Sequence, residues 1–473
     1  MRKPARIAWL ALFLAAGVGS VFAADEGPRF STELITKGER LAVAADCQAC
    51  HTQTGGGERF AGGYSIATPV GVIYTTNITP DKETGIGRYS EAQFARAVRE
   101  GIRADGTPLY PAMPYTSYIK LNDEDIHALY AYFMNGVAPV VRHNRRTELP
   151  FPFNLRFIMP AWNRLFLEEG HFSADSSEDA QWNRGAYLVN GPGHCDACHT
   201  PRNVLLAEYS GQPLSGAMVG SWYAPNITSD PISGIGGWSQ AQLIRYLKTG
   251  RAAGKNQAAG GMAEAIENSL QYLSDDDLAA IAAYLKNSPP IRDRRDTQPA
   301  DSFGKPFNVE PELRGAHPPN ANETVNDGAA LFSGNCASCH QPDGSGSQNQ
   351  AYPSLFNNTA TGSRNPSNLI SAMLFGVERR VGDQHILMPN FGPQSYVNPL
   401  SDQQIAAIGN YVLQHYGNPA THVTAEDVAI LRRGGPAPLL AEMQPYMAPG
   451  LGGGGLALLA AIIAWRVRKR RSA

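Results

Sequence analysis

One short pattern, Cys-x-x-Cys-His, occurs three times in this chain and constrains its fold more than any other feature. The copies begin at Cys47, Cys195 and Cys336 and use all six cysteines of the 473 residues. Two thiols separated by two residues reach the two vinyl groups of one porphyrin, and the adjacent histidine then coordinates the iron. The sequence therefore predicts three covalently bound c-type haems.

Other uses of paired cysteines explain the pattern less well. A structural zinc ion needs four ligands, and neither a disulfide nor a thioredoxin-like redox pair explains a histidine directly after each second cysteine. We therefore predict thioether bonds at the cysteines and proximal iron ligands at the histidines. These residues are Cys47, Cys50, Cys195, Cys198, Cys336 and Cys339, and His51, His199 and His340.

The sixth ligand of each iron decides between electron transfer and catalysis. An open site suggests ligand or peroxide chemistry, whereas a methionine closes the site and raises its potential. Met113 and Met262 follow their motif histidines by 62 and 63 residues, and Met388 follows His340 by 48. A lone methionine usually packs in a core, but this matched register predicts three distal ligands. His385 is a rival to Met388.

The spacing of the motifs indicates tandem domains. Their starts are 148 and 141 residues apart, which matches three repeated units. Segment 75–101 also aligns with segment 224–250, and each contains Asn-Ile-Thr, which we expect to shape a loop near the haem edge and not to carry a glycan. A helical pattern precedes each motif, and another follows far downstream with an Asn or Ser N-cap. The predicted helix pairs are 34–45 with 123–133, 184–190 with 275–285, and 327–332 with 402–413.

Both ends of the chain carry apolar segments. Residues 1–23 have a basic start, an apolar run and a small-residue cleavage site, which predicts a secretory signal peptide; the alternative is a short N-terminal anchor. No charged residue lies between Gln444 and Trp465, and a basic cluster follows. We expect a membrane-anchoring helix there, with its tail in the cytoplasm. The alternative is a helix lying on the membrane surface.

These features together predict an all-α protein made of three tandem class I-like cytochrome c domains with long loops and a C-terminal membrane-anchoring helix. The predicted segments are a signal peptide at 1–23, domain 1 at 24–140, an interdomain segment at 141–180, domain 2 at 181–288, a linker at 289–322, domain 3 at 323–420, a second linker at 421–445, the anchor at 446–465 and a basic tail at 466–473.

One stretch of the interdomain segment, 153–167, is too apolar for a free linker. It could pack the first domain on the second, or face a partner or the membrane, and we favour packing.

Charge excludes one class of partner. Because 8 of the 40 basic residues lie in the two terminal segments and all 42 acidic residues lie between them, the exported body has ten more acidic than basic residues. An acidic surface is unsuited to nucleic acid, so we expect no nucleic-acid partner.

Several runs resemble one family over nearly the whole chain, from about residue 33 to the basic tail. They include AADCQACHT, YTTNITPDKETGIG, WNRGAYLVNGPGHCDACHTPRN and CASCHQPDGSGSQ. They are similar to the triheme cytochrome c subunit of membrane-bound periplasmic dehydrogenases for alcohol, fructose, gluconate, sorbitol or aldehyde. The resemblance implies a separate catalytic subunit with flavin, pyrroloquinoline quinone or molybdopterin, with or without a small subunit. The C-terminal segment favours the flavin type.

The same resemblance implies that the chain passes electrons through three haems to ubiquinone, at the periplasmic face of the inner membrane and anchored by its C-terminus. It implies the twelve haem-binding residues named above and no catalytic residue. The alternative function is a haem enzyme, a peroxidase or oxidase subunit, with an open iron. The remaining histidines do not recur in register, which disfavours that alternative.

Overall fold

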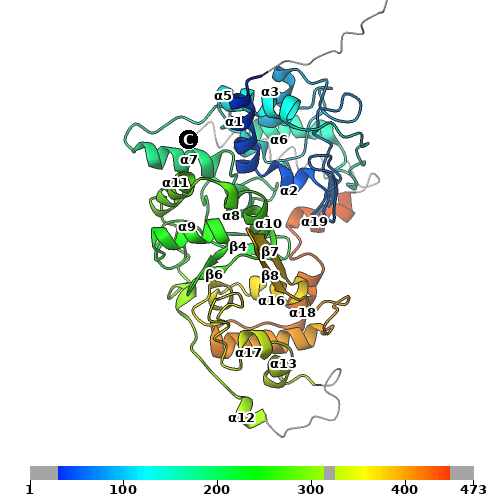
Figure 1. The fold of residues 1–473 in the computed structure, drawn as a ribbon. Helices are drawn as coiled ribbons and strands as arrows, with labels where there is room; N and C mark the ends of the chain where they lie inside the picture. The colour runs from blue at the N-terminus through cyan, green and yellow to red at the C-terminus, as the bar shows by residue number, and fades with distance from the viewer. Residues whose placement is uncertain (1–29, 314–324, 448–473) are drawn as a thin grey trace, which may run out of the picture.

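The computed structural model describes residues 30–313 and 325–447, which form three units stacked in sequence order (Figure 1). The first unit runs from α1 to η1 (residues 32–136), the second from α7 to α11 (180–286) and the third from α13 to α18 (328–432). The first and third units lie at opposite ends of the stack, and the second lies between them.

Each unit is closed by a pair of helices from its two ends. The pairs are α1 (Thr32–Ala44) with α5 (Asp123–Ala131), α7 (Ala180–Asn190) with α11 (Asp275–Lys286), and α13 (Gly328–Asn335) with α17 (Asp402–Tyr416). The later helix of each pair begins where its N-cap predicts, because the side chain of Asn122, Ser274 or Ser401 accepts a hydrogen bond from a first-turn backbone N–H.

A glycine lies at each helix crossing. A Cβ added to Gly38, Gly185 or Gly328 would lie 1.9, 2.0 or 2.5 Å from the carbonyl oxygen of Ala128, Ala280 or Ala407, respectively. The first helix therefore rests directly on the backbone of the last helix. The crossing closes the frame that holds the loops of each unit.

The remaining elements are short, and most lie between the paired helices in the chain; η1 and α18 follow the last helix of their units. In the first unit they are α2 (Cys47–His51), β1 (Ser65–Thr68), β2 (Gly71–Tyr74), α3 (Glu91–Glu100), α4 (Tyr115–Tyr118) and η1 (Tyr132–Gly136). In the second they are α8 (Asp196–His199), β3 (Ala217–Val219), β4 (Trp222–Ala224), α9 (Gln240–Thr249), β5 (Arg251–Ala252), β6 (Asn256–Gln257), α10 (Gly260–Asn268) and η3 (Leu270–Tyr272). In the third they are α14 (Ala337–His340), α15 (Thr359–Gly362), α16 (Ser367–Phe375), β7 (Val377–Val381), β8 (Gln384–Met388) and α18 (Ala425–Arg432).

The prediction of an all-α fold is wrong. In the described residues, four two-stranded antiparallel sheets pair β1 with β2, β3 with β4, β5 with β6, and β7 with β8. Their strands have two to five residues, too few for a clear alternating pattern. Gly220 and Gly382 supply the left-handed backbone of two of the turns, with φ of 58° and 53°.

The structure also corrects the prediction of a C-terminal membrane-anchoring helix and of a location anchored through it. No helix in the two described ranges is long and apolar enough to cross a membrane. The longest, α17, has 15 residues, about 22 Å against the ~30 Å hydrocarbon layer. The signal peptide (1–23), most of the predicted anchor (446–465) and the basic tail (466–473) lie outside the described residues.

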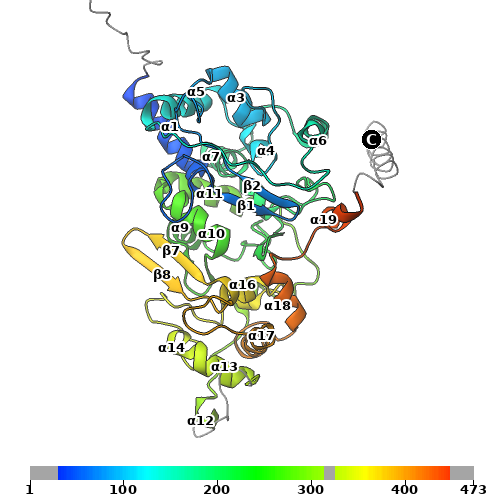
Figure 2. The ribbon, with the colours of Figure 1, turned by 90° about the vertical axis from the view of Figure 1, so that its right-hand side faces the viewer.

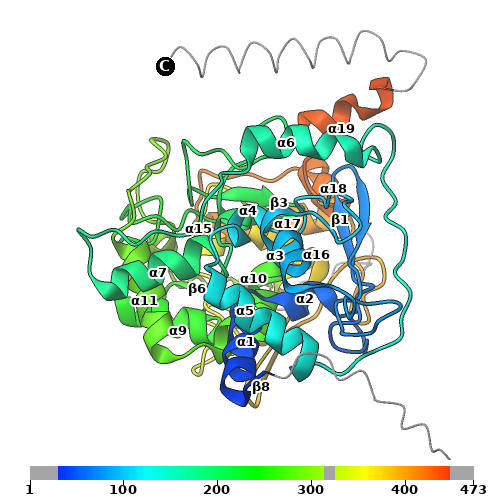
Figure 3. The same cartoon turned by 90° about the horizontal axis from the view of Figure 1, so that it is seen from above.

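The connecting segments carry further elements: η2 (Arg156–Ile158), α6 (Met159–Phe166), η4 (Ala300–Ser302), α12 (Glu310–Leu313), α19 (Leu439–Met443) and η5 (Gln444–Met447). Helix α6 lies on the same face of the stack as α19 (Figure 3). It joins the first two units, because Tyr115 donates to Asn163 of α6 at 2.7 Å and Trp162 of α6 donates to the carbonyl of Leu205 at 3.0 Å. The favoured interpretation of 153–167 as a packing segment is confirmed.

Each unit has its own buried hydrophobic cluster, and side chains cross between neighbours. Ala44 of α1 packs in the cluster of the second unit, and Tyr187 of α7 packs in that of the first. Met218 of β3 packs against the cluster of the third unit. The hairpin β7–β8 of the third unit contacts α10 of the second (Figure 2). The units therefore pack closely against one another.

Candidate haem sites

Each Cys-x-x-Cys-His motif lies in a short helical turn directly after the first helix of its unit. None of the six cysteines forms a disulfide. Asp46 and His194, just before the first two motifs, have positive φ of 49° and 37°, so the chain bends sharply there. The crossing of the paired helices holds the motif residues in place beside them.

Each of the three motif histidines makes the same kind of hydrogen bond. Their Nδ1 atoms lie 2.7, 2.6 and 3.0 Å from backbone carbonyl oxygens. The pairs are His51 with Thr76, His199 with Pro225, and His340 with Pro353. Because a carbonyl only accepts, each Nδ1 carries the proton and each Nε2 keeps a free lone pair. This arrangement is typical of histidines that ligate a metal through Nε2.

Burial sets the protonation of the motif side chains. It lowers the pKa of all three histidines, against the opposing effect of the carbonyl contact, and so favours the neutral imidazole that iron requires. Burial raises the pKa of Cys47, Cys195 and Cys336 to about 12. Within the described residues, no group of three or more His, Cys, Asp or Glu side chains could hold a metal ion.

The three predicted distal methionines occupy different kinds of structure. Met113 lies in the turn before α4 and packs against the first cluster. Met262 lies in the first turn of α10, and Met388 is the last residue of β8. The rival His385 is nearly half exposed and its Nε2 lies 3.0 Å from Glu378. This position favours Met388 over His385 as the distal residue.

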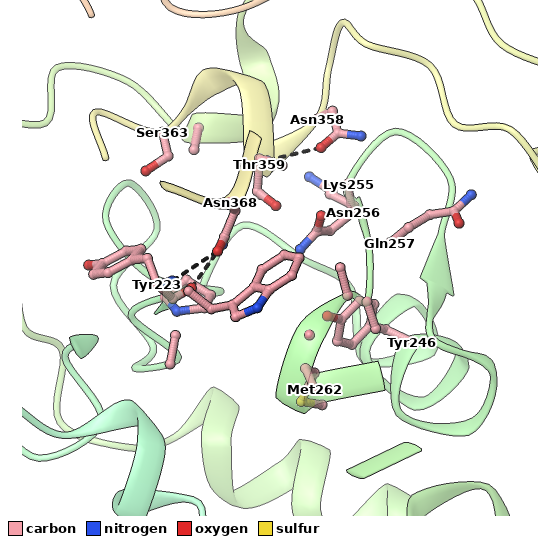
Figure 4. A pocket seen from close by; sticks show the side chains of 18 of the residues that line it. Tyr223, Tyr246, Lys255, Asn256, Gln257, Met262, Asn358, Thr359, Ser363 and Asn368 are labelled. Atoms are coloured by element: carbon pink, nitrogen blue, oxygen red, sulfur yellow. Dashed lines mark hydrogen bonds between the residues drawn. The ribbon is translucent and has the colours of Figure 1, made fainter. Parts of the chain in front are cut away.

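One cavity of about 1190 Å³ contains the predicted haem residues of both the second and the third unit. This volume exceeds the ~300–1,000 Å³ of a site for one small molecule. The motif and methionine side chains on its wall are Cys195, Cys198, His199, Met262, Cys336, Cys339, His340 and Met388. Figure 4 shows Met262 on one side of this space. Of the first unit, Ala44, Asp46 and Tyr64 reach the wall; the structure does not bring its predicted ligands there.

Comparisons with known proteins agree with this geometry. The family Cytochrome c matches residues 35–136 and 325–415. The chain is 48% identical to the fructose dehydrogenase cytochrome subunit of Gluconobacter japonicus, over 93% of this chain and 92% of that protein. It is 40% identical to the gluconate 2-dehydrogenase cytochrome c subunit of Pantoea cypripedii, over 87% and 92% of the two chains. The chain belongs to the family of cytochrome c subunits of dehydrogenases.

Membership in this family confirms the predicted resemblance. The chain is a cytochrome c subunit with an electron-transfer role, and the alternative of a haem enzyme with an open iron is not favoured. It is also 39% identical to the cytochrome c subunit of alcohol dehydrogenase (quinone) from Gluconacetobacter polyoxogenes, over 86% of this chain and 85% of that one. Covalent haem c and a catalytic dehydrogenase partner follow from the family.

In this cytochrome subunit the Asn-Ile-Thr loops hold the carbonyls that contact the histidines. Asn77 follows Thr76 and is 2% exposed, and its amide group accepts from Thr79 and donates to the carbonyl of Val140 at 2.7 Å. Asn226, after Pro225, makes the equivalent contacts with Thr228 and Ile291. The loop-shaping interpretation is confirmed. Such burial is incompatible with a glycan.

Sequence reasoning did not find the three carbonyl partners. The only signal for the first two is the constant distance from each motif histidine to its Asn-Ile-Thr loop. The third unit lacks that loop, so nothing in its sequence points to Pro353.

Helix α10 places the three candidate sites next to one another. It carries Met262 and contacts both the motif helix α2 of the first unit and the strand β7 of the third. Its Glu264 faces Asp46, whose pKa is raised to about 8 by burial and then by the Glu264 charge. The second site therefore lies between the other two.

Proposed function

We propose that this cytochrome subunit binds three c-type haems and passes electrons from its catalytic dehydrogenase partner to ubiquinone. The observation that carries the proposal is the threefold repetition of a cysteine pair, not joined in a disulfide, next to a histidine whose Nδ1 contacts a backbone carbonyl. When bound, haem supplies reversible one-electron transfer at each site.

The chain supplies attachment, orientation and burial. The proposed thioether residues are Cys47, Cys50, Cys195, Cys198, Cys336 and Cys339, and the proposed axial pairs are His51 with Met113, His199 with Met262 and His340 with Met388. The three carbonyls fix the imidazole rings and the apolar walls exclude water. A haem held by a histidine and a methionine would have no open coordination position, so the chemistry it would supply is electron exchange.

The proposed partners follow from the relatives. Ubiquinone as acceptor is supported by a relative whose own name specifies a quinone-dependent alcohol dehydrogenase. A catalytic subunit of the fructose type is supported by the 48% identity to the fructose dehydrogenase cytochrome subunit. The family resemblance associates that type with flavin.

The proposal includes three tandem haem domains and export. The three hydrophobic clusters, one for each motif, support domains at 24–140, 181–288 and 323–420. The sequence of residues 1–23 supports export through a signal peptide.

The haem count of the purified chain tests the proposal directly. A pyridine haemochrome assay should give three haems per chain, and changing both cysteines of one motif to serine should remove one haem each time. Near-infrared magnetic circular dichroism should show His/Met iron. Fewer than three haems in the unaltered chain, or a high-spin haem that readily binds carbon monoxide, would contradict it.

A further inference from the structure

The cavity shared by the second and third units has a polar seam where the two units meet. Lys255, between β5 and β6, places its Nζ 2.7 Å from a carboxylate oxygen of Asp301 in η4. The backbone N–H of Thr359 in α15 donates to the carbonyl of Lys255 at 2.8 Å. These three residues and Asn256 line the cavity and form what we call the seam. Figure 4 shows Lys255 beside Thr359, across the cavity from Met262.

The seam contains more buried hydrogen-bond donors than there are acceptors for them among the described residues. Only 17% of the Lys255 side chain and 8% of the Asp301 side chain are exposed. The Thr359 Oγ1 is buried and has no hydrogen-bond partner among the described residues. Asp301 accounts for one of the three N–H donors that an ammonium carries. Because an unpaired buried polar group costs free energy, these donors point to an acceptor inside the cavity.

The rest of the cavity wall around the second site indicates the chemical class of the ligand that carries this acceptor. Leu188, Leu243, Leu247 and Ile281 give it an apolar surface. The matching ligand is therefore large and apolar, with an anionic acceptor at one edge. A porphyrin with its two propionates has this form, and a carboxylate cannot be buried without such donors.

We propose that the seam binds a propionate carboxylate of a haem held in this cavity, through Lys255, Asn256 and Thr359. This rests on the proposed function, which places haems in the second and third units. Asp301 is then a positioning residue that holds the Lys255 ammonium at the seam.

The seam would also set the redox potential of that haem. A buried positive charge beside a porphyrin stabilises the reduced form, because reduction lowers the net charge on the iron. The Asp301 carboxylate opposes this effect. Both charges act in a poorly solvated space, where electrostatic interactions are stronger than in water.

The test uses the full chain purified with its haems. Lys255→Met should lower the midpoint potential of at least one haem in a spectroelectrochemical titration, and Asp301→Asn should raise it. Thr359→Val, which changes no charge, should shift a propionate bending band in the resonance Raman spectrum. Lys305→Met, at an exposed position of the linker, is the matched control and should change neither quantity. Lys255→Arg should keep the potential close to that of the unaltered chain.

Two results would overturn the proposal. One is a set of unmoved potentials and Raman bands in haem-complete Lys255→Met and Thr359→Val chains. The other is a potential that moves in the same direction in Lys255→Met and Asp301→Asn, which indicates a structural ion pair. Should Lys255→Met fail to accumulate, an unmoved band in Thr359→Val overturns it alone. A haem count below three in the unaltered chain would instead refute the proposed function.

Discussion

A single repeated hydrogen bond best explains how individual residues prepare each site. The Nδ1–H of every motif histidine donates a hydrogen bond to a backbone carbonyl oxygen, with Nδ1···O distances of 2.6 to 3.0 Å. The motif identifies the histidine from sequence, because its place after the second cysteine is fixed. It does not identify the carbonyl partner, because a backbone acceptor leaves no residue-type signal. The distal methionines remain predictions: Met262 of α10 and Met388 of β8 line the cavity, whereas Met113 does not.

At this scale the ligand assignment of the third site can be tested. Met388→His should lower the midpoint potential of one haem, since an imidazole favours ferric iron more than a thioether does. A spectroelectrochemical titration of the full chain measures it. His385→Ala should leave all potentials unchanged, because His385 contacts Glu378 outside the cavity. A changed potential with His385→Ala and none with Met388→His would reverse the assignment.

Among the elements, the paired helices were predictable and the hairpins were not. The helices that close the units begin at side-chain N-caps, and α5, α11 and α17 all start at the first predicted residue. The strands that make up the four small sheets have no such signal, because two to five residues cannot show a period. The close approach at Gly38, Gly185 and Gly328 also escaped prediction, since helix crossings join residues far apart in sequence.

The glycine at a helix crossing should be sensitive to a single methyl group. Gly328→Ala would place a Cβ 2.5 Å from the carbonyl oxygen of Ala407. Overpacking of this kind costs about 1–3 kcal/mol, so the denaturation midpoint of the third unit should fall. Gly334→Ala is the control on the same helix, with nothing within 4 Å of the added Cβ; it should stabilise by about 0.5–1 kcal/mol. Equal effects at both positions would contradict this account.

Asp230, in the loop between β4 and α9, gives a prediction about stability in acid. Burial raises the pKa of Asp230, but the Arg292 side chain and the backbone N–H groups of Ser233 and Ile232 outweigh it and hold that pKa below its ordinary value. Stability from Asp230 is therefore present above the unfolded pKa of about 3.9 and is lost as pH falls through the lower folded value. Asp230→Asn should cost about 1–3 kcal/mol at pH 7.

Chemical denaturation at pH 7 and pH 3 measures both effects of Asp230→Asn. The stability difference between the variant and the unaltered chain should shrink at the lower pH. Asp383→Asn, at an exposed position of the β7–β8 turn, should match the unaltered chain at both values. A difference that stays constant with pH would show that the Asp230 charge does not matter.

The whole molecule behaves as three joined units. The sequence predicted three repeats, but the contacts between them depend on side chains of different units meeting in space. The second and third units are linked by Asn368, whose side-chain amide accepts from the backbone N–H of Tyr223 at 2.9 Å and donates to its carbonyl at 2.8 Å. Ser371 adds a hydrogen bond to the carbonyl of Ser221 at 2.7 Å.

Loss of the Asn368 hydrogen bonds should make the second and third units unfold at different temperatures. Asn368→Ala leaves a backbone donor and acceptor of Tyr223 unpaired, at a cost of about 1–3 kcal/mol. Differential scanning calorimetry should show one transition splitting or broadening. Asn287→Ala, at the exposed end of α11, should leave the profile unchanged. An unaltered profile for Asn368→Ala would mean that the units are held together by other contacts.

The shared cavity has a consequence for biogenesis. Its walls come from two units separated by a long connecting segment, and the second and third motif cysteines face the same enclosed space. On the proposed function, the maturation enzymes must reach these thiols before the two units close on each other. On that proposal, haem attachment at Cys195 and Cys336 would precede the docking of the two units.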